Sequence, residues 1–152
     1  GMRTHTKGLS KERLKNYTNG RLGVIIDGTG HKFNSVKSER QDLMKLGYDT
    51  FMVFVNTSLE VAQQRNEERP RVLPKNVVED YWKNVQKNMA VFQGLFGNAN
   101  FLLVDNNQHL SPKAAQKKFN MLVGKGIGKF IKRPIKNKQA KKWIEKQKLL
   151  KK

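Results

Sequence analysis

The chain has 152 residues, the usual size of one folded domain, and 37% of them are hydrophobic, which excludes wholesale disorder. The absence of cysteine excludes disulfides, thiolate metal sites and a cysteine nucleophile, and the three histidines are too widely spaced to form a metal cluster. The formal net charge of +19 lies mostly in the last part of the chain: residues 111–152 carry 15 Lys and Arg against one acid, while residues 1–110 carry 16 against 11.

No part of the sequence predicts a membrane segment. The first residues lack the apolar core of a signal peptide, and nowhere do 18 apolar residues run together. We therefore expect a cytoplasmic protein without a membrane partner, and one that needs no cofactor in order to fold.

Two short apolar runs in the first half are typical of strands that are covered on both faces of a parallel sheet. The first is residues 22–27 (LGVIID) and the second is residues 50–55 (TFMVFV). Between them, apolar residues recur at helical spacing over residues 33–46, and Gly47 is placed to end this helix.

Two helices are predicted after the second run. Thr57-Ser58-Leu59-Glu60 fits a capping box, in which the Thr57 hydroxyl and the Glu60 carboxylate accept from backbone donors at a helix start. That helix should stop just before Pro70. Pro74 suits a first helical turn, and apolar residues then recur every three or four positions. They are Val78, Trp82, Val85, Met89, Phe92 and Phe96.

The last third of the chain predicts one more strand and two more helices. Residues 101–105 (FLLVD) repeat the pattern of an apolar run ending in an acid, and Ser111 followed by Pro112 opens a helix. A Gly- and Lys-rich stretch, residues 124–138, is expected to separate that helix from a final amphipathic segment.

Strands that alternate with helical segments of a dozen or more residues imply parallel crossovers. The predicted fold class is therefore α/β, with helices on both faces of the sheet. In such folds function gathers at the carboxyl ends of the strands, which here carry Asp27, Asn56 and Asp105.

Asp27 is the first candidate for chemistry. It leaves the predicted strand into Gly28-Thr29-Gly30, a turn in which a ligand can approach the backbone closely. Such a carboxylate can hold Mg²⁺ through water or accept a proton from a substrate hydroxyl. The alternative is a turn whose Asp caps the following helix.

Arg65, Arg69 and Arg71 form the second candidate. Residues 65 and 69 lie one helical turn apart, and residue 71 lies beyond the helix end. Converging guanidinium groups can clamp phosphoryl oxygens and neutralise the charge that develops during transfer. The alternative is a solvated face paired with Glu67 and Glu68.

Residues 124–129 (GKGIGK) superficially suggest a phosphate-binding loop. The spacing of G-x-x-x-x-G-K-[ST] is not met, because no Gly stands five residues before Gly128, and Phe130 replaces the Ser or Thr that would hold the metal. No such loop occurs elsewhere in the chain. We therefore expect that the chain does not bind ATP and transfer its phosphate unaided.

The basic tail mixes lysines with Phe130 and Trp143, a composition that suits contact with a nucleic-acid backbone together with some base stacking. A solvated basic helix explains the same residues. The nucleic-acid-binding candidates are Lys125, Lys129, Lys132 and Arg133.

Four segments, taken in order, resemble the small P-loop kinases of the adenylate kinase, polynucleotide kinase and zeta-toxin type, particularly predicted kinases encoded by viruses of bacteria. The segments are residues 24–30 (VIIDGTG), 51–56 (FMVFVN), 65–71 (RNEERPR) and 103–106 (LVDN).

This resemblance implies roles for particular residues. Asp27 matches the acid at the end of the strand beside the phosphate loop, where it would act as a catalytic residue and Mg²⁺ ligand. Arg65, Arg69 and Arg71 match the lid that closes over the transferred phosphate, and Thr29 joins them in the implied phosphate- and nucleotide-binding set. Mg²⁺ and ATP are the implied cofactors.

The departure from this family is the missing phosphate loop, which positions the nucleotide phosphates in an active kinase. The resemblance thus implies an incomplete P-loop NTPase-like parallel sheet flanked by helices, with a basic helical C-terminal tail. The family's missing strand would lie between residues 24–27 and 51–55. We expect this gap to be closed by direct pairing of those strands, or to be filled by a missing N-terminal segment or a second copy of the chain.

The predicted organisation is a helical lead-in over residues 1–21, a kinase-like domain over 22–123 and a basic tail over 124–152. The leading hypothesis is a fragment or degenerate relative of an ATP-dependent phosphotransferase with little or no activity as this chain. The alternatives are a nucleic-acid-binding module that acts through the tail, and a plain interaction or structural domain.

Overall fold

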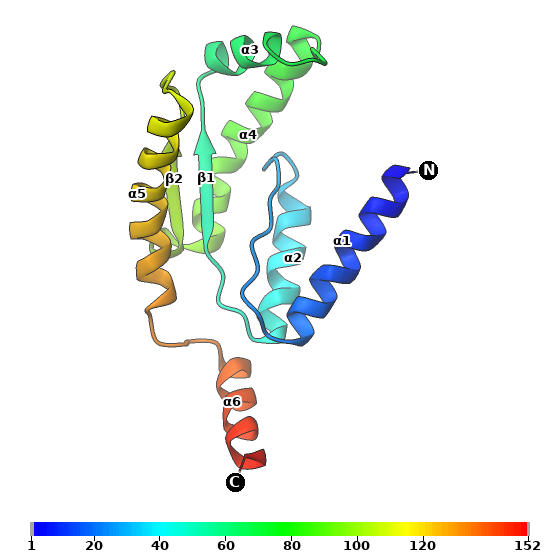
Figure 1. The fold of residues 1–152 in the computed structure, drawn as a ribbon, viewed down its shortest axis with the longest axis vertical. Helices are drawn as coiled ribbons and strands as arrows, with labels where there is room; N and C mark the ends of the chain where they lie inside the picture. The colour runs from blue at the N-terminus through cyan, green and yellow to red at the C-terminus, as the bar shows by residue number, and fades with distance from the viewer. Residues whose placement is uncertain (1, 152) are drawn as a thin grey trace.

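The structure is a computed structural model that describes residues 2–151, with side chains from residue 8 onward. Within these residues the chain forms six α-helices, one short 3₁₀ helix and two strands, and it is mostly helical (Figure 1). In chain order the elements are α1 (Met2–Asn19), α2 (Phe33–Leu46), β1 (Met52–Asn56), α3 (Leu59–Glu67), α4 (Lys75–Phe96), η1 (Asn98–Asn100), β2 (Phe101–Asp105), α5 (Pro112–Ile131) and α6 (Lys138–Leu150).

The two strands confirm the predicted α/β class with a parallel sheet. β1 and β2 pair in parallel, with Met52 opposite Phe101 and Asn56 opposite Asp105, and α3 and α4 form the crossover between them. α4 packs on one face of the sheet through Phe92. α5 lies on the other face, so helices cover both faces of the pair.

The core lies between β1, α4 and α2. Phe54, Phe92 and Phe96 are buried, and Phe92 has no exposed surface at all. The Phe92 ring centroid lies 6.3 Å from that of Phe54 and 5.4 Å from that of Phe33 in α2. Full burial of one such ring contributes about 2–3 kcal/mol, so this small aromatic cluster is a main source of stability.

Gly47 ends α2 as predicted. Its φ of 109° is left-handed, and its N–H donates to the Met44 carbonyl at 3.1 Å while the N–H of Tyr48 donates to the Leu43 carbonyl at 3.0 Å. The predicted capping box after β1 is wrong by one residue. Ser58, and not Thr57, caps α3, because its hydroxyl accepts from the N–H of Val61 at 3.3 Å.

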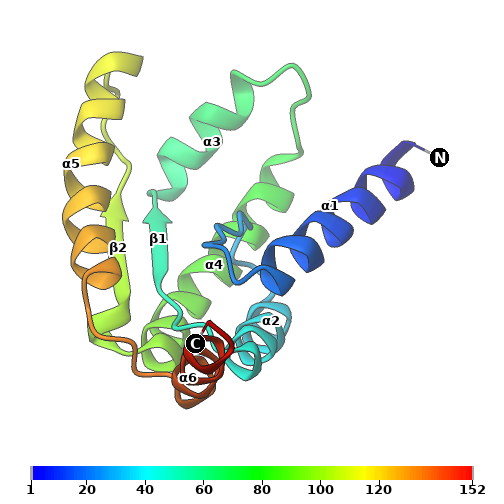
Figure 2. The same ribbon diagram turned by 60° about the horizontal axis from the view of Figure 1, so that its bottom comes forward.

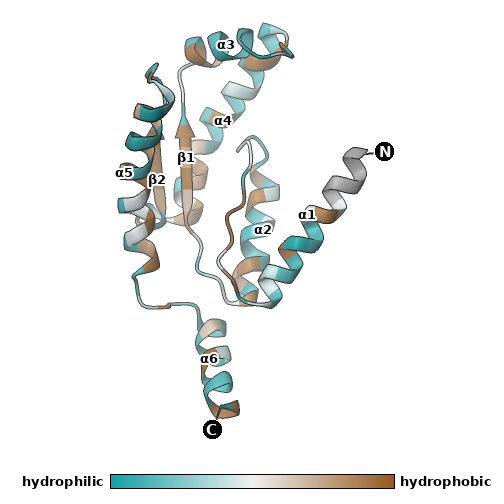
Figure 3. Cartoon of the chain, in the orientation of Figure 1, coloured by the Kyte–Doolittle hydropathy of each residue, from teal (hydrophilic) through white to brown (hydrophobic). Residues whose placement is uncertain are grey.

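The predicted strand at residues 22–27 is wrong. No β-structure is assigned there, and Ile25 is 96% exposed. Figure 3 shows hydrophobic residues along the coil that joins α1 to α2. The expected direct pairing of this segment with the second strand is also not observed, since the described sheet contains only β1 and β2. A buried parallel strand needs a hydrogen-bonded neighbour and a covering layer, and this segment has neither in the described structure.

The break expected over residues 124–138 is present but shorter, since only residues 132–137 separate α5 from α6. α5 runs through the glycines to Ile131. A Cβ on Gly126 would lie 3.0 Å from Cδ2 of Leu102, so glycine here lets the helix approach β2 closely. The ring of Phe130 then packs against Phe51, with centroids 5.1 Å apart. Tertiary contact thus keeps a glycine-rich segment helical despite its low intrinsic propensity.

The last helix docks at the far end of α2. Asn137 caps α6, and its Nδ2 also donates to the carbonyl of Met44 at 2.8 Å and to that of Tyr48 at 3.2 Å. Gly47 makes the approach tight, because a Cβ there would lie 3.0 Å from the backbone nitrogen of Ala140. Figure 1 shows α6 below α2, and Figure 2 shows it beside the end of α2, away from the arrowheads of the strands.

Candidate functional site

The carboxyl ends of β1 and β2 are joined by hydrogen bonds that continue beyond the sheet. The N–H of Asn106 donates to the Asn56 carbonyl at 2.9 Å. The Asn56 side chain accepts from Nε2 of Gln86 in α4 at 2.6 Å, and Nε1 of Trp82 donates to the Thr57 carbonyl at 2.8 Å. Two side chains of α4 therefore hold the turn that follows β1.

Asp105 is engaged by its own turn. Its carboxylate accepts from the N–H of Asn107 at 2.9 Å, and the Asn107 side chain accepts from the N–H of Ser58 at 2.5 Å. Ser58 is the residue that caps α3, so the turn after β2 sets the start of the helix after β1. These hydrogen bonds fix the turns at the carboxyl ends of the two strands, and Asp105 acts here as a structural acceptor.

The three candidate arginines lie where α3 meets the following loop. Arg65 is half-buried, and its Nη2 donates to the Asn106 carbonyl at 2.7 Å, which ties α3 to the end of β2. Arg69 and Arg71 are exposed in the loop over residues 68–74. Their exposure agrees with the alternative of a solvated face, but among the described residues no ion pair joins them to Glu67 or Glu68, and Glu67 pairs with Lys75 at 3.2 Å.

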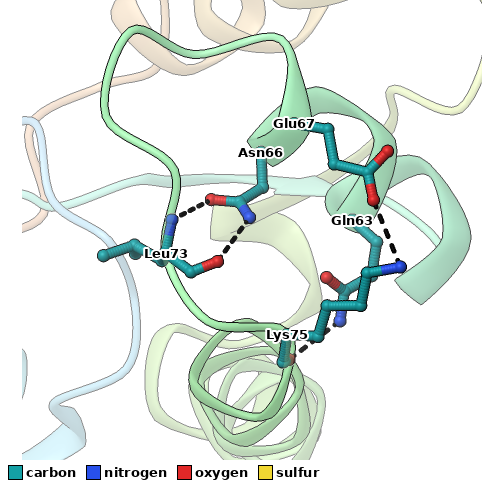
Figure 4. Close-up of polar contacts among 5 residues, drawn as sticks. All are labelled: Gln63, Asn66, Glu67, Leu73 and Lys75. Atoms are coloured by element: carbon teal, nitrogen blue, oxygen red, sulfur yellow. Dashed lines mark hydrogen bonds and ion pairs between the residues drawn. The ribbon is translucent and has the colours of Figure 1, made fainter.

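Asn66 fixes this loop, and the sequence did not single it out. It is 4% exposed, its Nδ2 donates to the Leu73 carbonyl at 2.9 Å, and its Oδ1 accepts from the Leu73 N–H at 3.0 Å (Figure 4). Gln63 adds a bond from Nε2 to the Lys75 carbonyl at 2.9 Å. The available sequence signal was weak: a polar residue in the last helical turn before a proline-containing loop.

Asp27 and Thr29 lie in the turn before α2, and both are exposed. Thr29 forms a hydrogen bond with Nδ1 of His31, and the Gly30 carbonyl accepts from Nδ2 of Asn88 in α4 at 3.0 Å. Among the described residues, no hydrogen bond or ion pair joins Asp27 to the arginines. Figure 1 shows this turn on the same side of the molecule as the arrowhead of β1.

A pocket of about 290 Å³ opens beside the end of β2, on the α5 side of the sheet. Asp105 and Phe119 line it together with Lys118, whose Nζ donates to Oε1 of Gln108 at 2.9 Å. Neither the candidate arginines nor Asp27 is part of its lining. The predicted site residues therefore do not surround this pocket.

The residues present do not by themselves fit a complete site for Mg²⁺ and ATP. Mg²⁺ is usually held by one or two carboxylates together with substrate phosphates. Asp27 offers one exposed carboxylate, and the described residues contain no group of three or more His, Asp or Glu side chains that could hold a metal. The sequence also contains no phosphate-loop motif, whose backbone amides would hold the nucleotide phosphates. No catalytic step can therefore be assigned to Asp27 and the three arginines alone.

The tail candidates divide into two kinds. Lys125, Lys129 and Lys132 are exposed at spacings of four and three residues, which places them on one side of α5. Arg133 is half-buried and donates to Oδ1 of Asn100 at 2.9 Å and to the Ala99 carbonyl at 2.7 Å. The lysines thus remain available to an outside partner, whereas Arg133 also fastens the end of α5 to the start of β2.

Comparison of the chain with known protein families, with characterised proteins and with solved structures finds no match. Within the described part of the chain, no helix is both long and apolar enough to cross a membrane. Function must therefore be inferred from the geometry of the two ends of the sheet.

Proposed function

We propose that this chain is the carboxyl-terminal portion of a nucleoside-triphosphate-dependent phosphotransferase and has little or no activity by itself. The observation that carries the proposal is the ordered arginine loop at the carboxyl ends of two parallel strands. Arg65 ties α3 to Asn106 at the end of β2, and Arg69 and Arg71 are exposed in the loop that follows α3. Guanidinium groups in this position can close over a phosphoryl group and neutralise its charge.

The lack of a phosphate loop explains why the chain should be inactive alone. Phosphoryl transfer depends almost wholly on positioning and charge stabilisation, and the amide nest and lysine that hold the β and γ phosphates are not in this sequence. The unpaired, exposed residues 22–27 support the idea that a neighbouring strand is supplied from outside the chain. We propose that a missing N-terminal segment carries both that strand and the loop.

The DNA upstream of the Met2 codon provides the decisive test. We expect it to encode an apolar strand followed by G-x-x-x-x-G-K-[ST] and a helix. Co-expression of that segment with this chain should then give Mg·ATP-dependent phosphoryl transfer. Arg69→Ala should lower the rate by roughly 1,000-fold, the scale of an arginine that stabilises transferred phosphate. Arg13→Ala, which removes an exposed arginine from α1, is the matched control and should leave the rate unchanged.

Two outcomes would contradict this proposal. If the upstream DNA encodes no phosphate-loop sequence, the proposed N-terminal segment does not exist. Phosphoryl transfer by the chain alone, lost in Asp27→Ala and retained in Arg13→Ala, would show that the chain is a complete enzyme.

A second candidate function is nucleic-acid binding through the tail, favoured by the exposed lysines that share one side of α5. Fluorescence anisotropy with a single-stranded oligonucleotide should show weaker binding for Lys125→Gln/Lys129→Gln. Each lost phosphate contact should also reduce the slope of log K against log salt by about 0.7. The control pair Lys11→Gln/Lys15→Gln has the same spacing on α1. An equal loss of affinity in both double variants would show that binding depends only on the net charge of the chain.

A further inference from the structure

A second pocket, of about 460 Å³, lies at the opposite ends of the strands, between the ends of α2 and α5 and the beginning of α6. Three arginines from separate parts of the chain line it: Arg21, Arg40 and Arg133. Asp49 is the one acid in its lining, and its Oδ2 accepts from the backbone N–H of Lys136 at 3.1 Å. Positive charge in the pocket therefore exceeds negative charge.

Neutral partners hold the three guanidinium groups in place. Nε of Arg40 donates to Oγ1 of Thr50 at 3.0 Å, and Nη1 of Arg21 donates to the Thr18 carbonyl at 2.7 Å. Arg133 uses both terminal nitrogens on the amide oxygen of Asn100 and the carbonyl of Ala99. Among the described residues, no ion pair joins any of the three to a carboxylate. Their geometry is thus fixed while their charge is left uncompensated.

Arg21 joins the pocket wall directly after the end of α1. Its Nε is buried and has no hydrogen-bond partner among the described residues. Arg21 also has a φ of 56°, because it closes the end of α1: its N–H donates to the Thr18 carbonyl at 3.2 Å, and the N–H of Leu22 donates to the Tyr17 carbonyl at 3.0 Å. Its guanidinium carbon lies 5.9 Å from the ring centroid of Trp143. The end of α1 therefore sets the position of this guanidinium group beside Trp143, in the wall of the pocket.

We propose that this pocket binds the phosphate group of a nucleotide. The phosphate oxygens accept from the guanidinium groups of Arg21, Arg40 and Arg133, whose charge no carboxylate neutralises among the described residues. Trp143 is 40% exposed and forms part of the pocket wall, so its ring offers a surface on which a base can stack. The basic residues of the tail raise the local concentration of such an anion.

The phosphate can belong to a free nucleotide or to a nucleic-acid strand, because both present the same chemistry to the pocket. The proposal is independent of the phosphotransferase proposal, since the arginine loop of that function lies at the carboxyl ends of the strands. Arg69→Ala should therefore leave binding at this pocket unchanged, which keeps the failure of one proposal distinct from the failure of the other.

The test is an NMR titration of the ¹⁵N-labelled full chain that follows the arginine Nε–H signals. Three probes are added separately: inorganic phosphate, AMP and a deoxythymidine decamer. The Arg21 signal, assigned by its loss in Arg21→Gln, should shift in a saturable manner with at least AMP or the decamer. Arg21→Gln should weaken binding by about tenfold, while Arg13→Gln should change it by less than about twofold.

Arg21→Lys is the second variant, since it retains the charge but lacks the planar set of donors of a guanidinium group, and it should also bind about tenfold more weakly. Binding of the decamer at least about tenfold tighter than AMP would identify a nucleic-acid strand as the source, and similar affinities would identify a free nucleotide. An Arg21 signal that does not shift with any probe, or equal affinity in wild type and in folded Arg21→Gln and Arg21→Lys, would overturn the proposal.

Discussion

Residues 22–27 (LGVIID) and β1 (MVFVN) are two apolar runs that differ in their surroundings more than in their composition. β1 pairs with β2 along its whole length, and Phe54 packs against Phe92. Residues 22–27 are held near their ends, where Tyr48 donates to the Leu22 carbonyl at 2.9 Å and Asn88 donates to the Gly30 carbonyl. An apolar run thus becomes a strand only when another strand and a covering layer are in place.

The largest loss of stability is expected when a buried side chain of β1 is truncated. Phe54→Ala should lower the free energy of unfolding by about 3–5 kcal/mol, because it removes a ring from the core and leaves a cavity. Ile25→Ala, in the segment that did not become a strand, should change it by less than about 0.5 kcal/mol because the side chain is exposed. Urea denaturation followed by circular dichroism measures both.

A loss of more than about 1 kcal/mol in Ile25→Ala would break the comparison, since the residue would then have to be buried in solution. Sedimentation at several protein concentrations would show whether a second copy of the chain provides that burial. A monomer with this loss would contradict the exposed position of the segment directly.

A smaller loss of stability is expected when the loop over residues 68–74 is released. Like residues 22–27, this loop has no strand pairing, but Asn66 fixes it. Asn66→Ala leaves the Leu73 N–H and C=O without their partner and should destabilise the fold by about 1–3 kcal/mol. Asn34→Ala, at an exposed position of α2, is the matched control. Equal thermal stability of both variants would mean that the loop does not depend on this amide.

The smallest effect on stability is expected at the first turns of α2 and α3, the helices that follow the two apolar runs. α3 begins with a capped turn, whereas the cap residue of α2, Lys32, makes no side-chain capping bond. Hydrogen bonds from the Glu60 backbone N–H and from the Ser58 side chain lower the pKa of Glu60. Its contribution to stability is therefore present above the ordinary value of 4.5 and is lost as the pH falls through the lowered pKa.

Thermal unfolding between about pH 3 and pH 7 should show this small difference. Glu60→Gln should reduce the acid-dependent loss of stability relative to wild type, and Glu39→Gln in α2 is the control. Identical pH profiles for wild type and Glu60→Gln would show that the cap does not couple to folding.

The sequence predicted most elements because their signals are local. Helical spacing and Gly47 identified α2 and its end, and the apolar runs identified β1 and β2. Arg65, Arg69 and Arg71 could be proposed as a candidate site from their spacing, but the sequence did not reveal that Asn66 fixes the loop that carries two of them. Asn66 acts on a residue seven positions away, and no local pattern marks such a bond.

The sequence by itself determined the α/β alternation, the missing phosphate loop and the basic tail, because these depend on residue order and composition. The tertiary structure alone decided that residues 22–27 stay unpaired and that α5 continues through its glycines, since both outcomes depend on neighbouring elements. It also brought Arg21, Arg40 and Arg133 to one pocket from positions far apart in the chain. Long-range packing sets those positions, and propensity and spacing describe only what lies within a few residues.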